Sequence, residues 1–183
     1  MLWGADASKG ELRMTRDQKV VGIGAVSGVT AMILLVWLLA RVIAPPAIAD
    51  TAADRIAYAL RWAVVAVLPL LFMIVAVGNA RAMGEAIDPT LGKESAKMGV
   101  DSRVVDNTLQ QFVCFLVGIV ALSVSLPIDR ISFVPAVAIT FVISRIIFWV
   151  GYRIRPLYRA PGFASTAYMN LCMYIAVIWI RLA

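Results

Sequence analysis

The chain has 183 residues, of which 62% are hydrophobic and 15% are charged, and its formal net charge is +6 at pH 7. A soluble domain typically has about 25% charged residues and about 45–50% apolar ones, so this composition excludes an ordinary water-soluble domain. The sequence contains no histidine, which excludes histidine-based metal sites and catalytic dyads or triads.

The excess of apolar residues lies in long uncharged blocks. A helix needs about 17–25 apolar residues to cross about 30 Å of hydrocarbon. The blocks are apolar on every side and lack the alternation of a membrane β-barrel, so we predict an all-α integral membrane protein. The five predicted spans are residues 20–43, 56–80, 107–128, 131–152 and 163–180.

The connections between these spans follow from their polar residues and prolines. Residues 1–19 carry charges of both signs and form a predicted N-terminal arm. Pro45 and Pro46 end the first helix, because proline lacks a backbone donor and disfavours helix before it. Pro69 is expected to kink the second helix. The longest polar connection is predicted at residues 81–106.

Lysine and arginine alternate between the two sides of the predicted membrane. The basic-rich segments are residues 1–19, 81–106 and 153–162, and the segments between them are basic-poor. With five crossings, the positive-inside rule places the N-terminus and both basic loops in the cytoplasm. This distribution also argues against nucleic acid as the partner of the positive charge. The small size, the alanine and valine bias and the lack of a transit peptide lead us to expect a bacterial inner membrane.

Cys114 and Cys172 both lie inside hydrophobic blocks. Their positions fit neither a disulfide framework nor a CxxC metal site. We therefore expect both cysteines to be small apolar core residues.

Polar residues recur at the start of the third predicted helix. Their spacings of three, four and seven residues place them on one helix face. They are Arg103, Asn107, Gln110, Gln111 and Cys114.

The fourth predicted helix also has a polar face near its cytoplasmic end, made by Arg145, Trp149 and Tyr152. Arg145 lies about 10 Å along the helix from Tyr152, at 1.5 Å per residue. A charge at mid-membrane costs at least about 2.5–3.5 kcal/mol and usually faces a polar cavity or a partner. Asp106 is expected to pair with Arg103 or to favour the helix N-terminus through the helix dipole.

Each of these residues also has an ordinary structural explanation. Arg145 can snorkel to the interface, Asn107 can cap a helix, and glutamines can join helices by hydrogen bonds. Taken together on two adjacent helix faces, the residues instead predict an arginine-rich pocket for a carboxylate-bearing anion. The sequence contains no GxSxG, HExxH, P-loop or GxGxxG motif.

Two runs of residues resemble the MAPEG family, the membrane-associated proteins in eicosanoid and glutathione metabolism. The first run is Arg103-Val-Val-Asp-Asn107-Thr-Leu-Gln110-Gln111, and the second extends from Arg145 through Gly151-Tyr152 to Arg159-Ala-Pro161. In the second run, arginine, Gly-Tyr and arginine fall at the spacings seen in leukotriene C4 synthase. The resemblance covers residues 56–183, so residues 20–43 would be an added helix, as in the mattrin-like branch of the family.

This resemblance implies a homotrimer whose sites lie between neighbouring subunits and open to the cytoplasm. It implies that glutathione is the ligand, that a lipophilic small molecule is the second substrate, and that Arg159 holds the glutathione thiol as thiolate. Arg81 lies near the place of a further arginine that binds a glutathione carboxylate. The residues at the implied ligand-binding positions are Arg81, Arg103, Asn107, Gln110, Arg145 and Tyr152.

Gln110 departs from the pattern, because glutathione-using members have a glutamate there that pairs with the ligand's amino group. A hydrogen bond to a charged group contributes about 1.5–3 kcal/mol, against about 1 kcal/mol for a neutral one, so Gln110 is expected to weaken glutathione binding. The family also contains a non-catalytic lipid-binding member, the 5-lipoxygenase-activating protein, and fold alone does not decide catalysis.

Three functions therefore remain open from the sequence. The first is a glutathione transferase or peroxidase that acts on a lipophilic substrate. The second is a non-catalytic lipid-binding, ligand-binding or regulatory membrane protein. The third, a small transporter, is disfavoured because neither discontinuous helices nor an inverted repeat is apparent.

Overall fold

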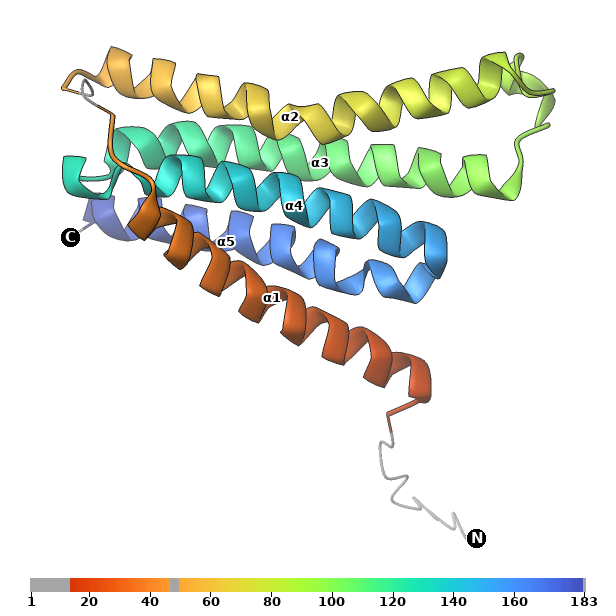
Figure 1. Ribbon diagram of the computed structural model, residues 1–183, viewed down its shortest axis with the longest axis horizontal. Coiled ribbons are helices and arrows are strands. Elements are labelled where there is room, and N and C mark those ends of the chain that lie inside the picture. Colours follow the sequence, from red (N-terminus) through yellow and green to blue (C-terminus); the bar gives the residue numbers. More distant parts are fainter. Residues whose placement is uncertain (1–13, 47–49, 183) are drawn as a thin grey trace, which may run out of the picture.

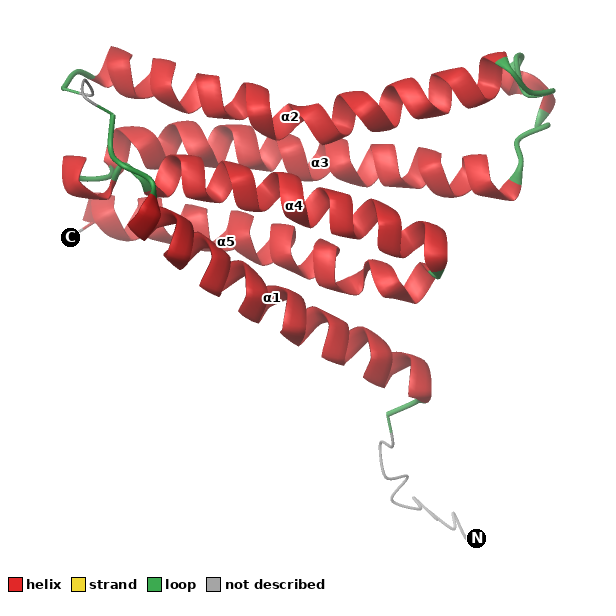
Figure 2. Ribbon diagram, in the orientation of Figure 1, coloured by secondary structure: helices red, strands yellow, loops and turns green. Residues whose placement is uncertain are grey.

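The computed structural model describes residues 14–46 and 50–182. Its regular structure in these residues is entirely helical, in agreement with the predicted fold class (Figures 1 and 2). The long helices are α1 (Arg16–Val42), α2 (Ala52–Ala82), α3 (Ala96–Ser125), α4 (Phe133–Ile154) and α5 (Ala160–Leu182). Short 3-10 helices lie at Pro89–Leu91 (η1), Ile128–Arg130 (η2) and Pro156–Arg159 (η3). All five long helices are long and apolar enough to cross a membrane, which confirms the predicted multi-pass protein.

Helices α2 to α5 lie side by side, and α1 crosses them obliquely (Figure 1). Helix α4 is central, because it contacts each of the other four helices, whereas α1 packs on α4, α5 and η3. The start of α1, the α2–α3 connection and η3 lie at one end of the bundle (Figure 1). The opposite end holds the α1–α2 connection, η2 and the C-terminal end of α5.

The centre of the bundle is filled by aromatic and branched side chains. Phe115 of α3 and Phe141 of α4 are fully buried, and their ring centroids are 4.5 Å apart. Ile119 and Met169 join the same core cluster. Burial of such side chains in close contact holds α3, α4 and α5 together through van der Waals packing, because lipid offers no hydrophobic drive for helix association.

The helices extend beyond the spans predicted from hydropathy. Helix α3 begins at Ala96, so the predicted connection of residues 81–106 is reduced to residues 83–95. The Ser95 hydroxyl oxygen accepts a hydrogen bond from the Met98 backbone N–H at 3.2 Å and caps this helix. Hydropathy detects only the segment within the hydrocarbon, whereas capping stabilises polar turns beyond it. Helix α2 likewise starts early, at a capping box formed by Thr51 and Asp54.

The predicted effects of the prolines and the predicted N-terminal arm can be compared with the structure. Helix α1 ends at Val42, shortly before Pro45 and Pro46, as predicted. Pro69 lies inside α2, and this helix bends near its middle (Figure 1). Of the predicted arm, residues 1–13 lie outside the described residues, and the helix already includes residues 16–19.

Our prediction that Cys114 and Cys172 are core residues is wrong, because both are exposed on the surface of the bundle. In a membrane helix the lipid-facing side and the core-facing side are both apolar. An uncharged block therefore does not reveal which of its residues are buried.

Candidate functional site

A pocket of about 510 Å³ lies at the end of the bundle where η3 connects α4 to α5. Its polar lining consists of Arg103, Asn107, Tyr152, Arg159 and Tyr168. Four of the seven residues predicted for the site are therefore brought together. No acidic residue lines this pocket in the described part of the chain.

Two glycines allow η3 and the start of α5 to pack closely against α4 and so build the pocket wall. A Cβ atom on Gly151 would lie 2.3 Å from the Tyr158 carbonyl oxygen, and one on Gly162 would lie 2.4 Å from the Phe148 backbone nitrogen. Any larger residue would separate these segments. The Gly151-Tyr152 pair thus serves two purposes, since the glycine admits η3 while the tyrosine faces the pocket.

The charge of the pocket comes from two arginines. The Arg159 guanidinium carbon lies 4.9 Å from the centroid of the Tyr152 ring. Neither Arg103 nor Arg159 forms an ion pair with any described residue, and the predicted pairing of Arg103 with Asp106 is not present. Two guanidinium groups without acidic partners, in a pocket beside an amide and a phenol, favour an anionic ligand such as a carboxylate or thiolate.

Arg145 does not line the pocket but lies directly behind it. Its side chain is 0% exposed. Its Nη1 donates to the Asn107 Oδ1 at 3.0 Å, and its Nη2 donates to the Gly162 carbonyl oxygen at 3.3 Å. The guanidinium carbon also lies 4.2 Å from the Phe148 ring centroid. Arg145 thus fixes the Asn107 side chain, whose Nδ2 remains a donor for a ligand, and Asn107 in mid-helix caps no helix.

The remaining predicted residues lie elsewhere in the single chain. Gln110 is exposed on α3 and Arg81 pairs with Glu94 at 2.5 Å, and neither lines the pocket. Their roles in ligand binding therefore stay predictions. Gln111 accepts a hydrogen bond from the Asn170 Nδ2 at 3.0 Å, which confirms that this glutamine joins two helices.

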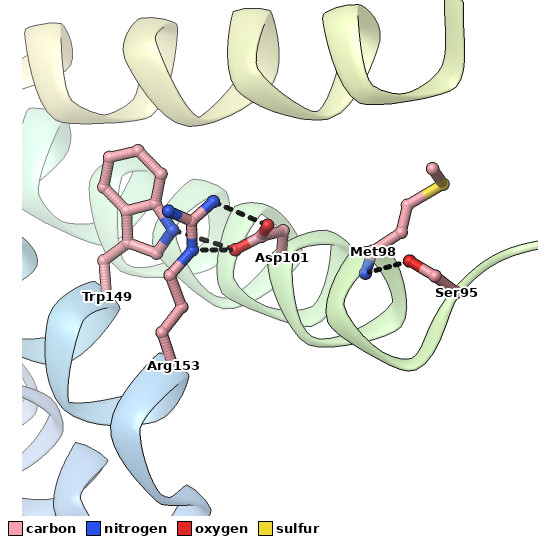
Figure 3. A network of polar contacts seen from close by, with 5 residues as sticks. All are labelled: Ser95, Met98, Asp101, Trp149 and Arg153. Atoms are coloured by element: carbon pink, nitrogen blue, oxygen red, sulfur yellow. Dashed lines mark hydrogen bonds and ion pairs between the residues drawn. The ribbon is translucent and has the colours of Figure 1, made fainter. Parts of the chain in front are cut away.

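Asp101 is a structural residue that the sequence did not reveal (Figure 3). The residue is 5% exposed on α3, and its carboxylate accepts hydrogen bonds from two residues of α4. The Trp149 Nε1 donates to Oδ1 at 3.0 Å, and the Arg153 Nε and Nη2 donate to Oδ1 and Oδ2, both at 2.7 Å. The contact joins α3 to α4 near the pocket. Asp101 is not predicted from the sequence, because it falls in residues 81–106, which the sequence indicates to be a connection. In a connection, an acidic residue cannot be assigned to a helix face.

The apolar lining includes two residues of α1, Val21 and Ala25. Sequence reasoning missed both, because the family resemblance does not extend to this helix. They complete a pocket that is cationic where α3, α4 and η3 meet and largely apolar along α1 and α5, where Tyr168 contributes one phenol. No group of three or more histidine, cysteine, aspartate or glutamate side chains suited to a metal ion occurs in residues 14–46 and 50–182.

Comparison with known proteins agrees with this architecture. The sequence matches the MAPEG family over residues 59–179, which is well over half of the chain. The chain belongs to the MAPEG family. The matched region contains all of α3, α4 and η3 and most of α2 and α5. Helix α1 lies outside it. The five polar residues of the pocket are therefore all in the MAPEG region.

Curated relatives of this MAPEG protein are mammalian. The chain is 26% identical over 125 residues to transmembrane protein 79 of Mus musculus, covering 68% of this chain and 32% of that protein. It is also 26% identical over 125 residues to transmembrane protein 79 of Bos taurus, covering 68% of this chain and 31% of that protein. The chain thus spans about a third of the length of the curated relatives it matches. No solved structure matches it.

Proposed function

We propose that this MAPEG protein binds glutathione in the pocket and transfers it to, or uses it to reduce, a lipophilic substrate. The observation that supports this most directly is the convergence of Arg103, Asn107, Tyr152 and Arg159 on one pocket without an acidic residue among its lining. Glutathione carries two carboxylates and a thiol, so it offers an anionic group to each guanidinium.

The chemistry of each side chain indicates which part of glutathione it would bind. Arg103 suits a bidentate bond to a carboxylate, and Asn107, held by Arg145, supplies an amide donor. Arg159 is the cation that would stabilise the thiolate, because a neighbouring positive charge lowers the pKa of a thiol. In conjugation, the thiol proton passes to water and the thiolate sulfur forms a bond to an electrophilic carbon, while the bond from that carbon to its leaving group or epoxide oxygen breaks and the electron pair stays on the departing atom. In peroxide reduction, two glutathione molecules supply the two electrons, the O–O bond breaks, and the products are glutathione disulfide, the lipid alcohol and water.

The orientation in the membrane is part of the same proposal. The pocket lies at the end of the bundle that carries the basic-rich segments, and the positive-inside rule places that end in the cytoplasm. Assembly as a homotrimer follows from the family resemblance, and location in a bacterial inner membrane stays a prediction from composition.

A non-catalytic binding or regulatory protein is the second candidate, and Gln110 favours it. This residue is neutral where glutathione-using members have an acid, and it is exposed outside the pocket. The ligand's amino group then lacks the charged partner that it has in those members. Under this alternative the pocket holds an anionic ligand without activating a sulfur.

The test compares wild type with Arg159→Ala for glutathione binding, for the ultraviolet absorbance of the thiolate, and for turnover of a generic electrophile and a lipid hydroperoxide. We expect wild type to bind glutathione as thiolate and to turn over. Arg159→Ala should lower kcat by about 100-fold, as loss of one stabilising donor does elsewhere. Arg155→Ala is the control, because Arg155 borders the same η3 turn but does not line the pocket. Glutathione binding without thiolate or turnover would favour the non-catalytic alternative, and absence of binding would contradict both uses of glutathione.

A further inference from the structure

We infer that α1, the helix outside the MAPEG match, is a specificity-determining wall of the pocket. In this account Val21 and Ala25 face the lipophilic part of the bound molecule, and the small side chain of Ala25 sets how large that part can be. The inference rests on the proposed function for the identity of the ligand, but the wall itself is defined by the contacts of α1.

Val21 and Ala25 are four residues apart on α1, so they lie one above the other on a single helix face. Both line the pocket, together with the α5 residues Phe163, Ala164 and Tyr168. A molecule held by its anionic end at Arg103 and Arg159 therefore meets α1 and α5 along its apolar part.

Helix α1 is held in this position by close contact with α5. A Cβ atom on Gly28 would lie 2.3 Å from the Pro161 carbonyl oxygen, and one on Gly24 would lie 3.1 Å from the Pro161 Cδ. The Ser165 hydroxyl donates to the Gly28 carbonyl oxygen at 2.8 Å. Gly24 and Gly28 thus form a small-xxx-small contact, in which two helix backbones approach closely.

The close contact of α1 with α5 leaves little conformational freedom at Ala25. It lies between the two glycines that fix α1 against α5, so a longer side chain cannot be accommodated by moving the helix outward without losing these contacts. The side chain must instead extend into the pocket. Pro161 also lies two residues after Arg159, so the position of α1 is tied to the segment that carries the pocket's cation.

The experiment measures the affinity of S-alkylglutathiones with increasing alkyl length for the full chain in lipid nanodiscs, by calorimetry with empty nanodiscs subtracted. Wild-type affinity should rise by about fourfold for each methylene that becomes buried, until the apolar part of the pocket is filled. Ala25→Leu should bind S-methylglutathione as wild type does but bind the longest ligands about tenfold more weakly, because overpacking is destabilising. Ala25→Val should show the same loss of affinity for the longest ligands, but a smaller one.

The matched control is Val26→Leu, because Val26 is the next residue on α1 and is 68% exposed on the outside of the bundle. It should leave the length profile unchanged. Identical profiles for wild type and Ala25→Leu would overturn the inference, as would equal losses in Ala25→Leu and Val26→Leu. If S-methylglutathione binds none of the proteins, the proposed function fails. The same length series is then run with n-alkyl phosphates, where an Ala25→Leu effect supports the wall and its absence overturns it.

Discussion

Arg145 and Arg159 both lie near the pocket, but their surroundings give them different roles. Arg159 lines the pocket, and its guanidinium lies over the Tyr152 ring. Arg145 is buried behind the pocket and directs its guanidinium at the Asn107 side chain and a backbone carbonyl. Arg159 is therefore available to a ligand. Arg145 instead positions Asn107, which is available to a ligand. The cost of placing a charge within a membrane helix is offset at Arg145 by these contacts and by the Phe148 ring.

Arg145→Lys is expected to weaken glutathione binding by about tenfold. A lysine ammonium lacks the planar fork that reaches Asn107 and Gly162 together, and an amide left without its partner loses about 1–3 kcal/mol. The measurement is a double-mutant cycle with Asn107→Ala, read by calorimetric titration. If Arg145 acts through Asn107, the two effects will not add, whereas strict additivity would show that Arg145 has no positioning role.

At the scale of whole helices, polar contacts between α3 and α4 gather in the first turns of α3, around the start of the predicted span of residues 107–128. Asp101 lies in the first turns of α3 and receives three hydrogen bonds from Trp149 and Arg153 of α4. Because the same part of α3 carries Arg103 and Asn107, this contact fixes the rotation of α3 relative to α4. The geometry of the pocket thus depends on an ion pair that does not itself line it.

Asp101→Asn is expected to lower the free energy of unfolding by about 2 kcal/mol, since hydrogen bonds to charged groups contribute about 1.5–3 kcal/mol. Urea or thermal unfolding in detergent, followed by circular dichroism, provides the measurement. The control is Asp106→Asn, because Asp106 is exposed on the same helix and forms no ion pair with a described residue. Equal losses in the two variants would show that the Asp101 contact does not hold α3 to α4.

The number and type of helices could be predicted from the sequence, because the bilayer imposes a length and an apolar composition on each span. The alignment of Arg103 with Asn107 also followed from spacing, and the cost of an intramembrane charge predicted that Arg145 faces a polar cavity or a partner, which is Asn107. The partners of these residues did not follow, because they depend on the relative rotation of packed helices. Asp101 and Ala25 show this limit, since each is ordinary in sequence and acquires its role only across a helix–helix contact.

At the scale of the whole molecule, the bundle has two unlike ends. The end at η3 combines the pocket, the Asp101 contact and the ion pair of Asp17 with Arg155 at 3.6 Å. The opposite end has a largely apolar crevice between α1 and α5, lined by residues such as Trp37 and Trp179. The MAPEG region supplies the cationic part of the pocket, and α1, which is outside that region, covers its apolar part. The chain thus combines, in one site, the family scaffold and a helix that lies outside the family match.

The most direct test of this account is calorimetric titration of glutathione into the solubilised protein and its Arg103→Gln variant. We predict saturable binding to wild type and about tenfold weaker binding to Arg103→Gln, because a charge-assisted carboxylate bond is replaced by a neutral one. Lys93→Gln, which removes an exposed cation from the α2–α3 connection outside the pocket, should bind as wild type does. Absence of binding to wild type, or equal affinities for wild type and Arg103→Gln, would contradict the claim that this pocket is the glutathione site.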